Sequence, residues 1–242
     1  MKRRLGAPAG LFAAEAAGLA WLRVPGGARI VAVIDVSDDA ITLERLQPVA
    51  PTRVAAHAFG EALAVTHDAG APAFGAAPDG FLGQSFIADL PLETTPEPSW
   101  GRFFATQRLL PFAHAALGRS GLDVIERLAQ RLSDGVFDDD AAPARLHGDL
   151  WSGNVMFTPA GVTLIDPSAH GGHRLSDLAM LALFGAPFLD DILDAYATAS
   201  TVLPAGWRTL IGLHQVYPLL VHAVLFGGGY GAEAVATARQ YL

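Results

Sequence analysis

Cysteine is absent from the 242 residues, which excludes disulfides, thiolate metal sites and a cysteine nucleophile. The absence fits a reducing compartment, so we expect a cytoplasmic protein. Charge is scarce, because charged residues make up 17% of the chain and hydrophobic residues 51%. This balance excludes a disordered chain and a coiled coil. Basic residues number 16 against 24 acidic ones, and the resulting net charge of −8 disfavours a nucleic-acid partner.

Long uninterrupted apolar runs are also missing. Met1–Arg4 is basic and precedes an Ala-rich stretch, as in a signal peptide, but Pro8 and Glu15 interrupt that stretch. The strongest membrane candidate, Tyr217–Phe226, contains His222 and is much shorter than the ~18 apolar residues that a membrane span needs. We therefore expect neither a cleaved signal nor a membrane partner.

The hydrophobic pattern divides the chain at a joint marked by prolines. Pro48 and Pro51 separate a small N-terminal unit, residues 1–47, from a larger and mostly helical unit, residues 48–242. The small unit is expected to hold one helix and one hairpin, and the larger unit several helices and a buried hairpin, giving an α+β protein. Residues 70–98, rich in Gly and Pro, are expected to form a long ordered loop. The predicted helices lie at 12–22, 52–69, 99–112, 120–134 and beyond 174, and the predicted hairpins at 29–36 with 40–46 and at 155–157 with 162–165.

One short string carries most of the chemistry. Asn154 follows Asp149 by five residues, which is the Asp-to-Asn spacing of a kinase catalytic loop, and Asp166 ends a predicted strand. Phosphoryl transfer needs a carboxylate that accepts the proton of the attacking hydroxyl, together with hard oxygen ligands for Mg²⁺. These three residues supply that set, and a short loop beside a hairpin lets them converge.

The string His147-Gly148-Asp149-Leu150-Trp151-Ser152-Gly153-Asn154 resembles the catalytic loop of the fructosamine kinase (ketosamine-3-kinase) family. That family belongs with the aminoglycoside and choline phosphotransferases in the protein-kinase-like fold. Asp166–Arg174 resembles its metal-binding strand and the segment that follows, and further similarity runs through 100–110, 177–185 and 214–230. The resemblance covers nearly the whole chain from about Phe12 and implies a two-lobe protein-kinase-like fold.

The resemblance also implies roles for individual residues. Asp149 would be the catalytic base, and Asn154 and Asp166 would hold Mg²⁺. Trp151 would either form a wall of the sugar site or pack in the core. The segment between the lobes, whose backbone meets the adenine of ATP, would be Glu44, Arg45 and Leu46.

Two further sets of residues lie outside the string. Lys2 resembles the strand lysine that contacts the ATP phosphates in kinases, and Glu15 lies on the inward face of its predicted helix, where it needs a partner. His170 and His173 follow the metal-binding strand. We interpret them as residues that structure this loop rather than as a metal pair, and we assign His173 to the substrate side of the site.

The N-terminus departs from the family pattern. No Gly-rich phosphate-covering loop precedes Lys2. We therefore expect a shortened small lobe in which the hairpin Arg29–Leu46 exposes a sheet edge. Leu175-Ser176 also stands where the family usually has an acidic residue, which leaves substrate specificity open.

These observations predict an ATP- and Mg²⁺-dependent kinase that phosphorylates a hydroxyl of a sugar-derived ketoamine, free or attached to a protein. Two alternatives stay open at this point. One is an aminoglycoside- or choline-type kinase, and the other is a non-catalytic binding protein that kept the fold but lost phosphate coverage. The intact set of Asp149, Asn154 and Asp166 favours catalysis.

Overall fold

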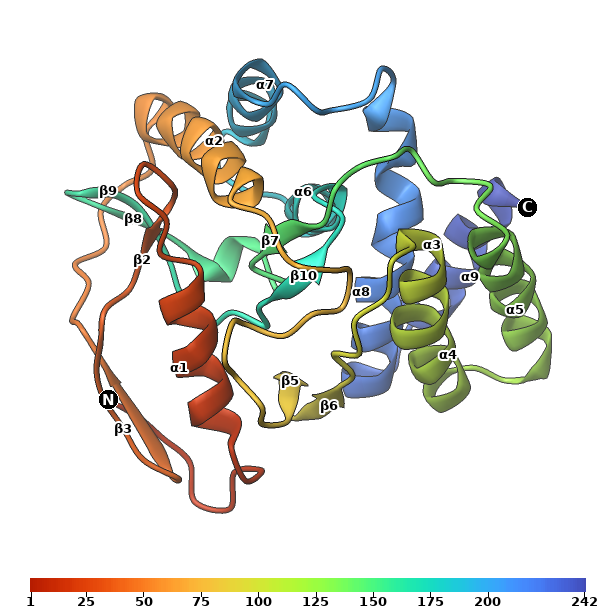
Figure 1. Cartoon of the computed structure of the whole chain (residues 1–242), viewed down its shortest axis with the longest axis horizontal. Helices are drawn as coiled ribbons and strands as arrows, with labels where there is room; N and C mark the ends of the chain where they lie inside the picture. Colours follow the sequence, from red (N-terminus) through yellow and green to blue (C-terminus); the bar gives the residue numbers. More distant parts are fainter.

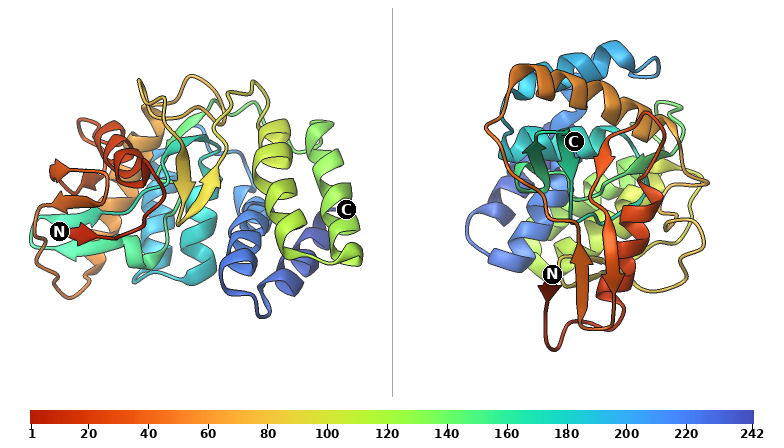
Figure 2. Two further views of the ribbon diagram at one scale, coloured as in Figure 1. Left: turned by 90° about the horizontal axis from the view of Figure 1, so that it is seen from below. Right: turned by 90° about the vertical axis from the view of Figure 1, so that its left-hand side faces the viewer.

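The computed structural model describes all 242 residues and has a two-lobe α+β architecture, as predicted (Figures 1 and 2). The small lobe contains one helix, α1 (Leu11–Trp21), and an antiparallel sheet in the order β1-β4-β3. The strands of this sheet are β1 (Lys2–Arg3), β3 (Val33–Val36) and β4 (Ala40–Leu43). Because β1 pairs with β4, it covers the hairpin edge that was predicted to be exposed, and β1 itself forms the outer edge.

The first predicted hairpin is interrupted. The sequence predicts one continuous strand over 29–36, but the structure divides it into β2 (Arg29–Ile30) and β3. Strand β2 pairs in parallel with β9 (Gly161–Leu164), and Ile30 lies opposite Leu164 in a shared hydrophobic core. Burial beside β9 therefore outweighs continuation of the hairpin, and one sheet, β2-β9-β8, joins segments from both sides of the proline joint.

The larger lobe is mostly helical, and Thr52 and Ser99 cap the first two of its helices as predicted. Residues 70–98 contain a hairpin that the sequence analysis treats as loop, and the helix after Ser99 includes a π-helical segment, η1. The elements are α2 (Arg53–Asp68), β5 (Ser85–Ile87), β6 (Leu90–Leu92), α3 (Trp100–Phe103), η1 (Phe104–Leu109), α4 (Leu110–Ala116), α5 (Arg119–Ser133), β7 (Ala144–Leu146), η2 (Ser152–Asn154), β8 (Val155–Thr158), β9, β10 (His170–Gly172), α6 (Leu175–Phe184), α7 (Leu189–Ala199), η3 (Trp207–Leu210), α8 (Ile211–Phe226), α9 (Tyr230–Ala238) and η4 (Arg239–Tyr241).

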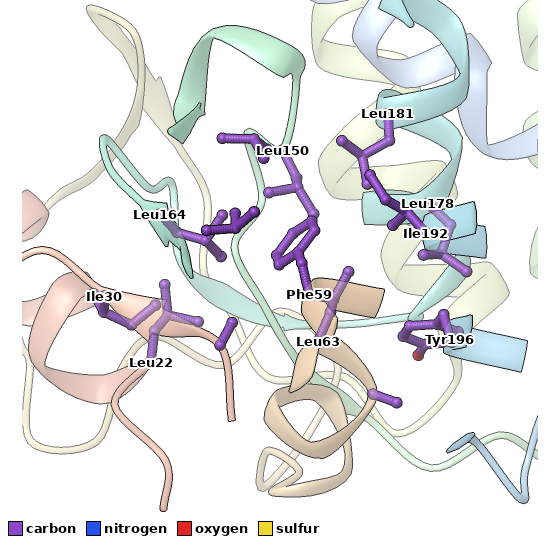
Figure 3. Close-up of a cluster of buried hydrophobic side chains, with 14 of the residues drawn as sticks. Leu22, Ile30, Phe59, Leu63, Leu150, Leu164, Leu178, Leu181, Ile192 and Tyr196 are labelled. Atoms are coloured by element: carbon purple, nitrogen blue, oxygen red, sulfur yellow. The ribbon is translucent and has the colours of Figure 1, made fainter. Parts of the chain in front are cut away.

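Two hydrophobic cores hold these elements together. The first joins the lobes, since Leu22 and Ile30 of the small lobe pack in one cluster with Phe59, Leu150 and Leu178 (Figure 3). The second fills the space between α3, η1, α4, α5, α8 and α9. It contains five large side chains from the helical segment after Ser99, namely Trp100, Phe103, Phe104, Leu109 and Phe112.

The apolar helix that ends at Phe226 is longer than the sequence suggests. Trp207–Phe226 forms one continuous helical segment of 20 residues, which by length and composition alone is apolar enough to cross a membrane. In the structure, α8 packs against α6, α9 and α4. Leu213, Val216 and Leu220 of this helix are fully buried there, so core packing accounts for the apolar composition.

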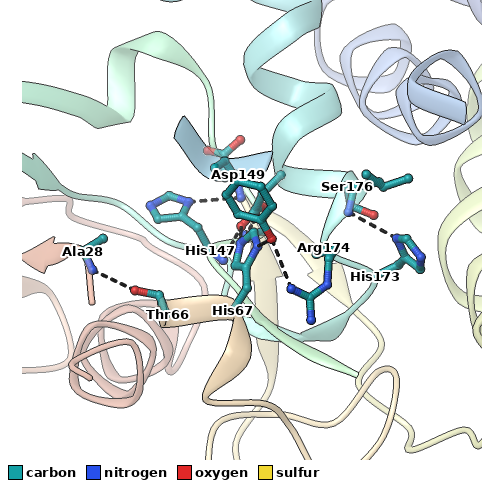
Figure 4. A network of polar contacts seen from close by, with 12 residues as sticks. Ala28, Thr66, His67, His147, Asp149, His173, Arg174 and Ser176 are labelled. Carbon is teal, nitrogen blue, oxygen red and sulfur yellow. Dashed lines mark hydrogen bonds and ion pairs between the residues drawn. The ribbon is translucent and has the colours of Figure 1, made fainter. Parts of the chain in front are cut away.

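A buried carboxylate fixes the turn that follows β7. Asp177 of α6 accepts hydrogen bonds from the backbone N–H groups of His147, at 2.8 Å, and Gly148, at 2.9 Å. It also contacts His67 Nε2 of α2 at 3.1 Å, and His67 Nδ1 lies 2.7 Å from the hydroxyl of Tyr196 on α7 (Figure 4). Burial raises the pKa of Asp177, but the contacts with His67 and with the turn lower it by a larger amount. The pKa of Asp177 is therefore below its ordinary value. The ionised carboxylate thus connects three helices to one turn.

Gly60 of α2 lies directly against the backbone of α7. A Cβ at Gly60 would collide with the carbonyl oxygen of Ile192 and press on Ala195 and Tyr196. We expect Gly60→Ala to lower the free energy of unfolding by about 1–3 kcal/mol through overpacking. Gly229→Ala is the matched control, because a Cβ there meets no atom within 4 Å. Urea denaturation of both variants tests this, and equal stabilities would contradict the proposed contact.

Removal of the Asp177 carboxylate leaves buried donors without an acceptor. We expect Asp177→Ala to lower the free energy of unfolding at pH 7 by about 3–5 kcal/mol. The pKa of Asp177 is lower in the folded state than the value of about 3.9 in the unfolded chain. The carboxylate therefore stabilises the fold above about pH 3.9, and this stabilisation is lost as pH falls through the folded-state pKa. Denaturant titrations from pH 7 to pH 3 should therefore show a shrinking difference from wild type. Asp123→Ala, at an exposed position on α5, is the control.

Candidate active site

A cavity of about 420 Å³ lies where α1, the β5–β6 hairpin and the turn after β7 meet. Six charged side chains line it: Lys2, Arg4, Glu15, Asp89, Asp149 and Asp166. Trp151 and Asn154 line it as well. The structure therefore gathers around one space six residues that the sequence analysis singles out, although two lie near the N-terminus and four lie within residues 149–166.

Asp149 lies partly buried at the base of this cavity. The preceding residue, Gly148, has a φ of +80°, and a Cβ there would collide with the carbonyl oxygen of Ser168, so only glycine fits this turn. Asn154 Nδ2 donates to the backbone oxygen of Asp149 at 2.8 Å and to its Oδ2 at 3.0 Å. Burial raises the pKa of Asp149 to about 6, even though the Asn154 hydrogen bond lowers it. The carboxylate is thus ionised at neutral pH and close to the point of taking up a proton.

Asn154 and Asp166 are held side by side. The backbone N–H of Ile165 donates to the carbonyl oxygen of Asn154 at 3.2 Å, which ties the end of β9 to the turn containing η2. Asp166 then adopts a left-handed backbone conformation with a φ of +53°. Such a conformation is unfavourable for a non-glycine residue and is concentrated at functional sites. It turns the Asp166 side chain into the cavity wall.

Lys2 links the two lobes across the cavity. Its ammonium Nζ donates to Glu15 Oε2 at 2.9 Å and to Asp166 Oδ1 at 2.8 Å. Glu15 projects from α1 and is only 8% exposed, and its Oε1 has no hydrogen-bond partner. The pairing of Lys2 with Glu15 therefore occurs as the sequence predicts, and Asp166 is an additional partner of the lysine.

The donor set at Asn154 and Asp166 fits a hard cation. Asn154 Oδ1 and Asp166 Oδ2 make no hydrogen bond, and both residues line the cavity. Mg²⁺ prefers such carboxylate and amide oxygens and usually completes its shell with water and substrate phosphates. The structure holds no cluster of three or more His, Cys, Asp or Glu suited to a metal.

Trp151 lies at the edge of the cavity rather than in the core. Its side chain is 42% exposed, and its ring covers Gly153, where a Cβ would collide with it. An exposed aromatic ring beside a cavity that contains charged side chains fits a wall for a sugar ring better than it fits core packing.

His173 does not reach the cavity. It is 2% exposed, its Nε2 lies 3.2 Å from both carboxylate oxygens of Asp139, and its ring packs against Trp100 and His214. The structure therefore gives it a packing role in place of the predicted substrate contact. His170 is also buried, with Nδ1 2.8 Å from the carbonyl oxygen of Ser168.

The segment Glu44–Leu46 connects the lobes without lining the cavity. The Glu44 carboxylate pairs with Arg29 and accepts the backbone N–H of Ala32. Arg45 is exposed, and Leu46 packs against the core that joins the lobes. A contact between this segment and adenine stays a prediction.

Sequence reasoning missed the β5–β6 hairpin and Arg4 as parts of the site. Ser85, Phe86, Ala88 and Asp89 of this hairpin all line the cavity. The two-residue turn Ala88–Asp89 lacks the Asn-Gly or Gly-X signature of a tight hairpin, so the apolar residues on each side were the only available signal.

The chain is similar to known proteins over most of its length. A family model described as fructosamine kinase matches residues 4–242. An Enterococcus faecium protein assigned as a ketoamine kinase is 33% identical over 234 residues, covering 93% of this chain and 80% of its own. A Thermus thermophilus protein with the same assignment is 36% identical over 225 residues, covering 92% of this chain and 79% of its own.

Solved structures give the same result. The crystal structure of a Thermobifida fusca protein assigned as a fructosamine-3-kinase superposes with a TM-score of 0.88 at 44% identity, covering 97% of this chain and 81% of that one. The aminoglycoside phosphotransferase APH(4)-Ia shares the fold, with a TM-score of 0.59 at 14% identity over 95% of this chain and 83% of that one. With the matched family model, these similarities show that the chain belongs to the fructosamine kinase family.

Proposed function

We propose that this protein transfers the γ-phosphate of ATP to a hydroxyl of a sugar-derived ketoamine, at the third carbon of the sugar, in the cytoplasm. The observation that supports this most directly is the meeting of Asp149, Asn154, Asp166 and the Lys2–Glu15 pair at one cavity in a chain of this family. The ketoamine is either a small molecule or a sugar attached to a protein amine.

The proposed mechanism assigns one task to each side chain. The ionised Asp149 accepts a hydrogen bond, and then the proton, from the attacking hydroxyl, while Asn154 keeps the carboxylate oriented. Lys2, held by Glu15, contacts the phosphates. Asn154 and Asp166 would hold Mg²⁺, which when bound neutralises the charge that develops on the phosphates.

A panel of acceptors tests the function directly. Turnover of ATP by the purified protein with ketoamines, aminoglycosides and choline separates the proposal from its alternatives. Ketoamine-dependent phosphate transfer supports it, and preferential turnover of either other class contradicts it. ATP binding without turnover of any acceptor would indicate a non-catalytic binding protein.

Asp149→Asn should reduce turnover by about 10²–10⁴-fold, because general-base catalysis is lost while the shape is kept. Nucleotide affinity should stay close to that of wild type, since Asp149 acts on the acceptor. In the wild type, kcat should fall as pH drops through about 6, where Asp149 becomes protonated.

The stability of the same variant separates catalysis from misfolding. The folded pKa of Asp149 is raised, so its ionised form destabilises the folded state above about pH 6. Asp149→Asn should therefore be at least as stable as wild type at pH 8. Near-normal kcat in this variant would contradict the assignment of the base.

Asp166→Ala should make nucleotide affinity insensitive to Mg²⁺, because a metal ligand is lost. Calorimetry with a non-hydrolysable ATP analogue, with and without Mg²⁺, measures this. Lys2→Gln is the matched control, since it removes the same ion pair but keeps the carboxylate. If Mg²⁺ still tightens binding to Asp166→Ala as it does to wild type, Asp166 is not a metal ligand.

A further inference from the structure

The β5–β6 hairpin brings a carboxylate into the cavity that phosphoryl transfer does not use. Asp89 stands at the tip of this hairpin, which packs against α1 beside the cavity (Figure 1). Arg4 binds it through two hydrogen bonds, Nη1 to Oδ1 and Nη2 to Oδ2, the latter at 2.6 Å. Both residues line the same cavity as Asp149, so this ion pair forms part of the wall of the space that an acceptor must enter to reach the proposed base.

The charges around the cavity leave Asp89 without another task. Four carboxylates and two cations line the space, which gives a formal charge of 2 − 4 = −2 when all are ionised. Glu15 is held by Lys2, and Asp166 is shared between Lys2 and the proposed metal. Asp149 must stay free to accept the proton of the hydroxyl. Asp89 is bound by Arg4 alone and has no assigned part in phosphoryl transfer, so it is the carboxylate that a cationic group of the acceptor can reach by displacing Arg4.

The Arg4–Asp89 ion pair is weak enough for another cation to take the place of Arg4 beside Asp89. The side chains of Arg4 and Asp89 are 50% and 43% exposed, and an ion pair that is half in water stabilises a structure little. Ala88, next to Asp89, has a φ of +50°, which is unfavourable for alanine and persists only while neighbouring contacts hold it. A second cation can thus replace Arg4 at a small loss of stability.

A ketoamine carries such a cation. Its nitrogen is a secondary alkylamine next to the sugar, and an alkylamine is protonated at neutral pH as lysine is. A carboxylate that accepts a hydrogen bond from this ammonium would bind it more strongly than a neutral group of equal shape. Resting on the proposed function, we propose that Asp89 binds the ammonium group of the ketoamine substrate, and that Arg4 occupies its place until the substrate arrives.

This proposal predicts opposite effects for the two members of one ion pair. Asp89→Asn should raise KM for a cationic ketoamine by roughly 10- to 100-fold, the value of a hydrogen bond to a charged group, with a smaller change in kcat. Arg4→Gln removes the competing cation and should lower the same KM. Neither variant should alter KM for the matched ether, in which oxygen replaces the amine nitrogen.

Asp39→Asn is the control variant. It removes a comparably exposed ion pair, between Asp39 and Arg3, that lies in the same lobe but does not line the cavity. This variant should leave KM for the ketoamine and KM for the ether unchanged. The proposal is wrong if Arg4→Gln raises KM for the ketoamine as Asp89→Asn does, or if Asp89→Asn raises KM for the ketoamine and the ether equally. Either result would show that the ion pair only stabilises the structure of the site. If the wild type phosphorylates neither acceptor, the proposed function fails, and the inference fails with it.

Discussion

The active site depends on one carboxylate that does not line the cavity. Asp177 binds the two backbone N–H groups immediately before Asp149, so the position of the proposed base is set from behind the turn. A buried carboxylate is tolerated only when donors satisfy it, and here the donors come from the turn itself and from α2. Tyr196, Arg174 and Asp68 extend the same chain of contacts to the surface, which makes the turn part of a rigid helical frame.

Asp177 and Asp149 show how one environment produces two kinds of carboxylate. Burial raises the pKa of both. Asp177 receives three donors and stays ionised, whereas Asp149 has one side-chain donor, from Asn154, and its pKa rises to about 6. At Asp177 the donors and the nearby His67 and His147 together outweigh burial. At Asp149 the neighbouring Asp166 and Asp177 add to the effect of burial, so only Asp149 can exchange a proton near neutral pH.

The sequence predicts those parts of the site that depend on local spacing. Asp149, Asn154 and Asp166 lie on one turn and the adjoining hairpin, so their convergence follows from short-range geometry. Glu15 is also predicted, because a carboxylate on the inward face of a helix requires a partner, and Lys2 is predicted from its resemblance to the strand lysine of kinases.

The remaining differences arise from contacts between distant segments. Strand β2 pairs with β9, more than a hundred residues away along the chain, and no local pattern encodes that pairing. His173 is drawn into a stack with Trp100 and His214, which only the packing of three separate segments produces. The Ala88–Asp89 turn contains no glycine or asparagine, the residues that usually indicate a tight hairpin turn. The positive φ of Ala88 is imposed by the contacts around the turn.

The ion pairs of Lys2 have a consequence for the chemistry of the protein's own surface. Lys2 is the only lysine in the sequence. Burial lowers its pKa, but the hydrogen bonds from its ammonium group to Asp166 and Glu15 raise it above the ordinary value. Reducing sugars condense with amines that have lost their proton, and this ε-amine is held protonated between two carboxylates. A member of a family named for sugar–amine adducts therefore offers almost no side-chain amine on which such an adduct can form.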